Sequence, residues 1–174
     1  MTTKQAMPRV ALITGAGGSG GIGRAIARAF ASEGIALALS DVRRDSETLP
    51  PDEVATGWRG IDSVADEARE AGVEAESFHC DLTDLAAIDA MVARVIARFG
   101  RIDILVNNAR ALMGKDRAPV TELSREVWNT FLAVNATAPF VLMQTCARHM
   151  IERGGGGRII STGSDMSKRG RAMG

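Results

Sequence analysis

The residues most able to do chemistry lie in a glycine-rich run near the start of the chain. The run Gly15-Ala16-Gly17-Gly18-Ser19-Gly20-Gly21-Ile22-Gly23 follows an apolar segment and precedes a helical pattern. A pyrophosphate can approach backbone N–H groups closely where no side chain blocks it, and a helix N-terminus adds partial positive charge. The run therefore predicts a dinucleotide-binding turn rather than a flexible linker. Its expected cofactor contacts are Gly15, Ser19, Gly20, Gly21, Ile22 and Gly23.

The register of this turn stays open, because Gly-x-Gly-x-x-Gly fits both from Gly15 and from Gly18. An acidic side chain, Asp41, stands at the end of the second apolar segment. A carboxylate there can accept hydrogen bonds from the 2′- and 3′-hydroxyls of an adenosine ribose, and it repels a 2′-phosphate. Arg43 and Arg44 follow directly and could offset that repulsion. These residues favour NAD as the cofactor and leave NADP as the alternative.

A proline marks a second position of interest, within a long helical pattern. Pro139 lies four residues after Asn135 and has no N–H. The carbonyl of Asn135 therefore lacks its helical hydrogen-bond donor, and the helix should kink. A carbonyl freed in a cleft can hold a water molecule. The alternative is a kink with no chemical role.

Strand and helix patterns alternate along the chain, and these elements must position the residues above. Short apolar or alternating segments predict strands at residues 10–14, 35–40, 73–80, 102–107 and 157–162. All but the third are expected to be buried on both faces. Apolar residues at helical spacing predict helices over residues 22–30, 85–99 and 124–152, the second with Thr83 as its N-cap and Gly100 as its stop.

The alternation predicts an α/β fold, a Rossmann-type doubly wound parallel sheet of about five strands, in a single domain over residues 1–174. Residues 40–61 read as a long loop, with Glu47, Asp52, Glu53 and Trp58 among two prolines and a glycine. Long loops in compact domains are usually functional or disordered.

Composition excludes several classes of function. The 21 basic and 21 acidic residues balance, which argues against a nucleic-acid surface. Cys80 and Cys146 lie among apolar residues and read as reduced core thiols, which suits a cytoplasmic protein. His79 and His149 are too scattered for a metal site, so no metal is expected. The chain shows no signal peptide in its first nine residues and no apolar segment of about 20 residues, so no membrane partner is expected.

Taken in order, five motifs resemble the short-chain dehydrogenase/reductase family. They are Thr14-Gly15 with Gly21-Ile22-Gly23, Asp81-Leu82, Asn107-Asn108-Ala109, Asn135, and the segment from Gly157 that leads to Ser164. The resemblance implies that Asp81 and Leu82 contact the adenine, that Asn108 and Ala109 contact the cofactor, and that Asn135 and Ser164 are catalytic. It also implies hydride transfer between nicotinamide and an alcohol or ketone substrate.

The sequence also departs from the family pattern. It contains no tyrosine, so the Tyr-x-x-x-Lys motif expected about a dozen residues after Ser164 is absent. We therefore expect a truncated member that lacks the family's C-terminal strands, is inactive alone, and forms a homo-oligomer only at full length. A non-catalytic dinucleotide-binding module and a fold remnant without function are the alternatives.

Three further departures concern the cofactor side. The glycine turn is two residues longer than the family's, and Arg110 stands where the family has glycine, a position at which a positive φ would tolerate arginine poorly. The loop over residues 41–61 is long enough to lap over the adenosine.

Overall fold

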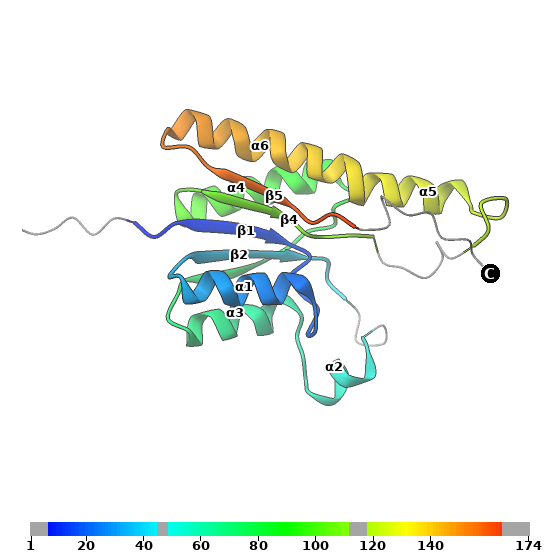
Figure 1. Ribbon diagram of the computed structural model, residues 1–174, viewed down its shortest axis with the longest axis horizontal. Coiled ribbons are helices and arrows are strands. Elements are labelled where there is room, and N and C mark those ends of the chain that lie inside the picture. The colour runs from blue at the N-terminus through cyan, green and yellow to red at the C-terminus, as the bar shows by residue number, and fades with distance from the viewer. Residues whose placement is uncertain (1–6, 45–48, 112–117, 165–174) are drawn as a thin grey trace, which may run out of the picture.

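The computed structural model describes residues 7–44, 49–111 and 118–164. They form a five-stranded sheet in the order β3-β2-β1-β4-β5, with every neighbouring pair parallel. Helices cover both faces of this sheet (Figure 1). The predicted α/β fold with a doubly wound parallel sheet of about five strands is therefore confirmed.

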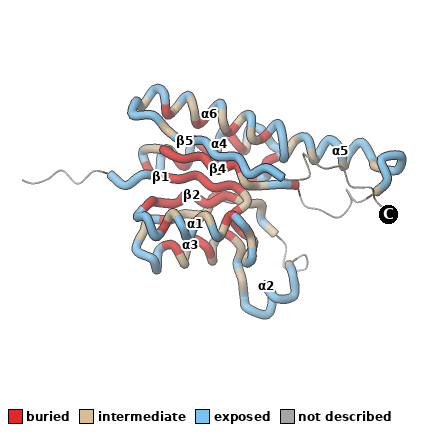
Figure 2. The backbone as a smooth tube through the Cα atoms, viewed as in Figure 1, coloured by how far each residue is buried: buried red, intermediate tan, exposed pale blue. Residues whose placement is uncertain are grey.

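The strands lie within the predicted segments, give or take one or two residues. Their bounds are β1 Val10–Thr14, β2 Ala36–Asp41, β3 Ala75–His79, β4 Ile104–Asn107 and β5 Arg158–Ser161. Burial follows the position in the sheet: β1 and β4 are fully buried, and Figure 2 shows the buried centre. The expectation that the fifth strand is buried on both faces is wrong, because β5 is the edge strand and all four of its residues are exposed.

Two separate hydrophobic clusters flank the sheet. One face packs against α1 (Ile22–Ser32) and α3 (Ile61–Glu70), through residues such as Ala27 and Val64. The other face packs against α4 (Leu85–Phe99) and α6 (Ala138–Arg153), through residues such as Val92 and Leu142. Helices α1, α4 and α6 each bury one apolar stripe, as the helical spacing in the sequence predicts, whereas α3 was not predicted from the sequence.

The ends of α4 show one wrong prediction and one confirmed one. Its N-cap is Asp84, whose carboxylate accepts hydrogen bonds from the N–H groups of Ala86 and Ala87 at 2.9 and 3.1 Å. Thr83 was the wrong choice because its own N–H and hydroxyl donate to Asp81 instead. Gly100 ends the helix with a left-handed φ of 73°, as expected.

A long helix, on the same side of the sheet as α4, consists of three consecutive parts. It begins after the N-cap Ser124 with α5 (Arg125–Leu132), passes through a π-helical turn, η2 (Ala133–Thr137), and continues as α6. By length and composition alone, these 29 residues could cross a membrane. No apolar segment of that length is expected from the sequence. The buried stripe of α6 nevertheless packs in the core cluster shared with α4.

The segment expected to be a loop is partly helical. The short helix α2 (Pro51–Ala55) starts with proline at its first position and has Asp52 and Glu53 in its first turn. Both features favour a helix start. Helix α2 extends away from the sheet, and most of its surface is exposed (Figures 1 and 2).

Candidate functional site

The carboxyl ends of the five parallel strands meet at one edge of the sheet. The glycine turn follows β1, Asp41 ends β2, and Asp81 follows β3. Asn108 follows β4, and Ser164 lies three residues beyond the end of β5. The topology therefore brings residues from distant parts of the chain to the edge where open α/β sheets bind their ligands.

Two glycines let the turn, the first helix and the end of β4 approach each other closely. Gly15 has a φ of +67°, and a Cβ added there would lie 2.6 Å from the Cα of Ala109. A Cβ on Gly23 would lie 2.5 Å from the carbonyl oxygen of Gly15 and 2.9 Å from Nδ2 of Asn108. No side chain fits at either position without moving backbone.

Hydrogen bonds between Thr14 and Asn108 hold this junction together. The Thr14 hydroxyl accepts from the N–H groups of Asn108 and Ala109 at 3.1 and 3.2 Å. The Asn108 side-chain amide donates to the carbonyls of Thr14 and Gly15, each at 3.0 Å. Its oxygen accepts from the hydroxyl of Thr162 at 3.3 Å, so one side chain links the ends of β1, β4 and β5.

The additional residues of the glycine turn contact the 41–61 segment. The N–H of Gly17 donates to Asp41 Oδ2 at 2.8 Å, and its carbonyl accepts from Trp58 Nε1 at 2.7 Å. The N–H of Ser19 donates to Glu53 Oε1 at 2.8 Å. The predicted cofactor contact at Ser19 thus has its amide engaged by a carboxylate of the protein.

Helix α1 adds a further contact to the same turn. The guanidinium of Arg24 donates to the carbonyl of Ser19 and lies 4.6 Å from the centre of the Trp58 ring. Reasoning from the sequence did not assign roles to Glu53, Trp58 or Arg24. Only the lone tryptophan and the acidic residues in an otherwise loop-like stretch hinted at them. The turn and the 41–61 segment therefore form one hydrogen-bonded unit.

Asp41 borders a cavity of about 140 Å³ beside the turn. The cavity is also lined by Arg43, Arg44, His79 and Trp58. Asp41 Oδ1 accepts from the N–H of Val42 at 2.8 Å. The carboxylate is oriented by these backbone donors. The lining also includes a third arginine, Arg59, and a second carboxylate, Asp62, so charges of both signs and two aromatic rings suit a polar or planar ligand.

The segment after β3 supplies one polar and one apolar side chain. Asp81 is exposed, and its Oδ1 accepts from the N–H and the hydroxyl of Thr83 at 2.9 and 2.8 Å. Leu82 is buried in the cluster beneath α4. Ile22, at the start of α1, is 61% exposed, so it presents an apolar surface next to the turn.

Asn135 lies in the π-helical turn, and its side chain points to the end of β4. Its Oδ1 accepts from the N–H of Ala111 at 2.9 Å. A kink is predicted here; the structure has a π turn, in which the N–H of Ala138 donates to the carbonyl of Ala133. Pro139 cannot donate to the carbonyl of Asn135 in α register.

The expected strain at Arg110 is wrong. None of the described non-glycine residues has a positive φ, so Arg110 adopts ordinary backbone geometry. Its side chain is exposed next to Ala109, and Nη1 lies 3.4 Å from the carbonyl of Ala111. Arginine therefore fits at this position and adds positive charge near the end of β4.

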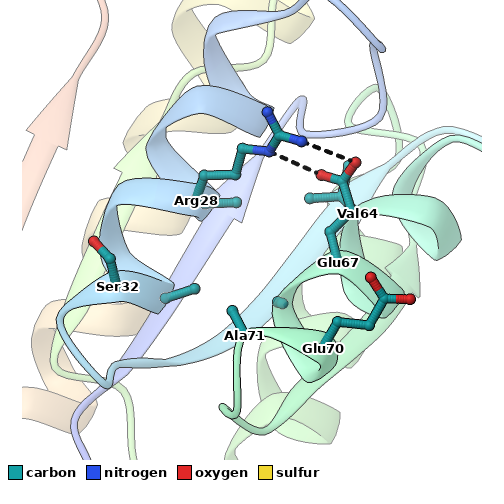
Figure 3. Close-up of a pocket in the computed structure, with 9 residues that line it drawn as sticks. Arg28, Ser32, Val64, Glu67, Glu70 and Ala71 are labelled. Carbon is teal, nitrogen blue, oxygen red and sulfur yellow. Dashed lines mark hydrogen bonds and ion pairs between the residues drawn. The ribbon is translucent and has the colours of Figure 1, made fainter.

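A larger cavity lies elsewhere, in a groove between α1 and α3 (Figure 3). Its volume is about 290 Å³, and alanines such as Ala27 and Ala68 form much of its lining. Arg28 and Glu67 face each other across it, with Nε and Oε2 3.1 Å apart. Hydrogen bonds from Arg24 and then Arg28 lower the pKa of Glu67. This groove holds none of the predicted site residues.

The chain matches known proteins along nearly its full extent. A family model described as short chain dehydrogenase matches residues 9–174. The chain belongs to the short-chain dehydrogenase family. Sorbitol dehydrogenase of Cereibacter sphaeroides is 37% identical over 95% of this chain and 56% of its own length. Galactitol 2-dehydrogenase of Agrobacterium fabrum is 36% identical over the same shares.

Solved structures give the same result for this short-chain dehydrogenase chain. A metagenomic short-chain oxidoreductase in complex with NADP has a TM-score of 0.77 and 37% identity, over 97% of this chain and 68% of that one. An NAD⁺-bound xylitol dehydrogenase has a TM-score of 0.76 and 34% identity, over 96% of this chain and 57% of that one. The chain spans about half the length of the curated relatives it matches, such as 56% of the sorbitol dehydrogenase.

Proposed function

We propose that this chain binds a nicotinamide dinucleotide at the carboxyl edge of its sheet, with NAD preferred over NADP. The pyrophosphate would lie at the N-terminus of α1, against Gly20, Gly21, Ile22 and Gly23. These residues follow the part of the turn that the 41–61 segment engages. The N–H of Gly21 donates to the carbonyl of Gly18 at 3.1 Å, so the amides of Gly20, Ile22 and Gly23 are the natural anion donors. Gly15 and Ala109 would supply the close backbone approach beside them.

The observation that carries this proposal is the orientation of Asp41. Its carboxylate ends β2, is held by the N–H groups of Gly17 and Val42, and borders a cavity of about 140 Å³. A carboxylate placed in this way accepts hydrogen bonds from ribose hydroxyls and repels a 2′-phosphate. Asp81, Leu82 and Asn108 would complete the contacts on the adenine and nicotinamide sides.

We further propose that the chain supplies the cofactor side of an oxidoreductase that transfers hydride between the nicotinamide and an alcohol or ketone. Ser164 would donate a hydrogen bond to the substrate oxygen and stabilise developing charge there. Asn135 would position a proton-carrying water through its main-chain carbonyl. The relatives named above act, by their names, on sorbitol, galactitol and xylitol, so sugar alcohols are the first substrates to offer.

The sequence contains no tyrosine to exchange a proton with the substrate, so binding without turnover is the expected behaviour of this chain alone. That residues 1–174 form a single domain, that the full-length form is a homo-oligomer and that its location is cytoplasmic stay predictions. A non-catalytic dinucleotide-binding module is the second candidate function.

Titration of the chain with NADH, followed by cofactor fluorescence, tests the proposal. We expect saturable binding that NAD⁺ displaces, and weaker binding of NADPH. Replacement of Asp41 by alanine should weaken NADH binding by roughly tenfold, because a charged hydrogen bond to the ribose is lost. Saturable binding with no sorbitol-dependent reduction of NAD⁺ supports the non-catalytic state; no binding of either dinucleotide rejects the proposal.

A further inference from the structure

Beside Asp41, two carboxylates share one cation: the side chains of Asp41 and Glu53 both face the guanidinium of Arg44. Arg44 Nη2 lies 3.4 Å from Asp41 Oδ2, and Arg44 Nη1 lies 3.8 Å from Glu53 Oε2. One guanidinium therefore faces two carboxylates through two different nitrogens. The side chain of Glu53 is only 4% exposed, whereas that of Arg44 is 23% exposed.

Glu53 is also bound to the glycine turn. Its Oε1 accepts from the N–H of Ser19 at 2.8 Å, while Oε2 has no hydrogen-bond partner among the described residues and lies 3.8 Å from Arg44 Nη1. A carboxylate that is nearly fully buried needs a counter-charge, since an unpaired buried charge is strongly unfavourable. Arg44 is thus held by Glu53 as well as by Asp41.

From this geometry we propose that Glu53 is a specificity-determining residue that reserves the site for a dinucleotide with a free 2′-hydroxyl. The inference rests on the proposed binding of a nicotinamide dinucleotide at this edge. A 2′-phosphate beside Asp41 needs a cation to offset the carboxylate, and Arg44 is the cation already paired with Asp41. Glu53 keeps Arg44 neutralised, so turning the guanidinium toward a phosphate would leave a buried carboxylate uncompensated.

Glu53 acts in a second way through the turn itself. The amide of Ser19 points at Glu53 Oε1, so this donor is withheld from any anion that enters beside it. A free ribose hydroxyl needs neither Arg44 nor the Ser19 amide. Glu53 therefore disfavours NADP through both its charge and its hydrogen bond, while it leaves the NAD contacts unchanged. Arg43 and Arg59 also line the cavity; Arg59 pairs with Asp66, so Arg43 is the competing source of positive charge.

The variant Glu53→Gln tests the charge directly. The glutamine carbonyl can still accept from the Ser19 amide, so the turn keeps its contact, and only the negative charge is lost. We expect the Kd for NADPH to fall by roughly tenfold and the Kd for NADH to change by less than about threefold. Asp52→Asn is the matched control, because Asp52 lies on the same helix, is exposed, and carries the same charge. That control should leave both constants unchanged.

The variant Arg44→Gln adds a test that does not depend on how Glu53→Gln folds. In the wild-type background it should change NADPH affinity by less than about threefold, because the guanidinium is already neutralised. In the Glu53→Gln background, Arg44→Gln should abolish the gain in NADPH affinity. A double-mutant cycle measures this dependence as a coupling free energy between Glu53 and Arg44.

Two results would overturn the role of Glu53 while NADH binding stays intact. One is an unchanged ratio of NADPH to NADH affinity in Glu53→Gln. The other is a loss of NADPH affinity of tenfold or more on replacing Arg44 alone, since the guanidinium would then already serve the phosphate. If the wild-type chain binds neither dinucleotide, the proposed function fails and this role fails with it.

Discussion

The side chain of Asn135 accepts a hydrogen bond from the backbone N–H of Ala111 at 2.9 Å. Asn135 lies in the π-helical turn of the long outer helix, and Ala111 lies just beyond β4. One contact therefore ties the irregular part of the helix to the edge of the sheet that carries the candidate site. Ala111 is 5% exposed, so its N–H has little access to water as a substitute acceptor.

Removing this acceptor should destabilise the chain. We expect Asn135→Ala to lower the free energy of unfolding by about 1 kcal/mol, because a buried amide loses its partner. Asn135→Asp keeps an oxygen in the same place and should retain most of the stability. Urea unfolding followed by circular dichroism measures both. Equal stability of the alanine variant and the wild type would show that Ala111 finds another acceptor.

Gly23 should not tolerate even the smallest side chain. A Cβ there meets the carbonyl oxygen of Gly15 at 2.5 Å, and the obstacle is backbone, which cannot rotate away. Gly23→Ala should lower the free energy of unfolding by about 2 kcal/mol, in the range for overpacked sites, and weaken NADH binding. Gly20→Ala is the stability control, since a Cβ at Gly20 meets nothing within 4 Å. Similar unfolding midpoints for the two variants would contradict the packing argument.

Asp103 joins the start of β1 to two arginines at the opposite edge of the sheet. Its carboxylate accepts from the N–H of Val10 at 2.9 Å, from Arg101 at 2.6 and 2.7 Å, and from Arg153 at 3.0 Å. Burial by itself raises the pKa of Asp103, but the hydrogen bonds from Arg101 and Val10 and the charges of both arginines lower it overall.

A lowered pKa in the folded state makes stability depend on pH in a definite direction. The contribution of Asp103 is fully present above its ordinary pKa of 3.8 and is lost as the pH falls through the lower pKa of the folded state. Asp103→Asn should therefore cost about 2 kcal/mol at pH 7 and progressively less below pH 4. Urea unfolding across pH 2 to 7 measures the difference.

Asp66→Asn serves as the comparison for Asp103. Hydrogen bonds from Arg59 and then Arg69 also lower the pKa of Asp66, but all three side chains are largely exposed. Exposed ion pairs contribute little, so this variant should change stability less than Asp103→Asn at every pH. A larger loss of stability in Asp66→Asn than in Asp103→Asn would show that burial does not decide which ion pair contributes more.

The two thiols should react slowly while the chain is folded. Burial raises the pKa of Cys80 to about 11 and that of Cys146 to about 12, from an ordinary value of 9.0. Nearby Asp81 and Asp84 add to the effect at Cys80. At pH 8 the thiolate fraction of Cys80 should thus fall about 100-fold relative to a free thiol.

Labelling with a thiol-specific reagent at pH 8, with and without concentrated urea, measures this protection. We expect two slow reactions in the folded chain, Cys146 slower than Cys80, and two fast ones in urea. Cys80→Ser and Cys146→Ser assign each phase. Rapid labelling of either thiol in the folded chain would place it at the surface or in an opening segment.

Much of the fold could be predicted because local patterns and the final structure agree. The strands of the sheet centre read as short apolar runs, and Gly100 stops its helix with the left-handed geometry that glycine allows. Predictions failed where two local choices were nearly equal. Thr83 and Asp84 are both good N-caps, and the bond from Thr83 to Asp81 decided between them. The apolar sequence of β5 is typical of a strand buried within a sheet, but β5 pairs only with β4, and the number of paired strands cannot be deduced from one segment.

The sequence by itself determined the glycine turn, the five strands, the helices at residues 22–30, 85–99 and 124–152, and the residue types at each strand end, but not α2 or α3. Those features depend on neighbours within a few positions, through glycine conformation, apolar spacing and the missing N–H of Pro139. Only the tertiary structure decided that Glu53 and Trp58 contact the glycine turn, because residues 34 and 41 positions apart meet through the packing of the 41–61 segment beside α1. Long-range contacts of this kind follow from the packing of whole elements, which local pattern does not encode.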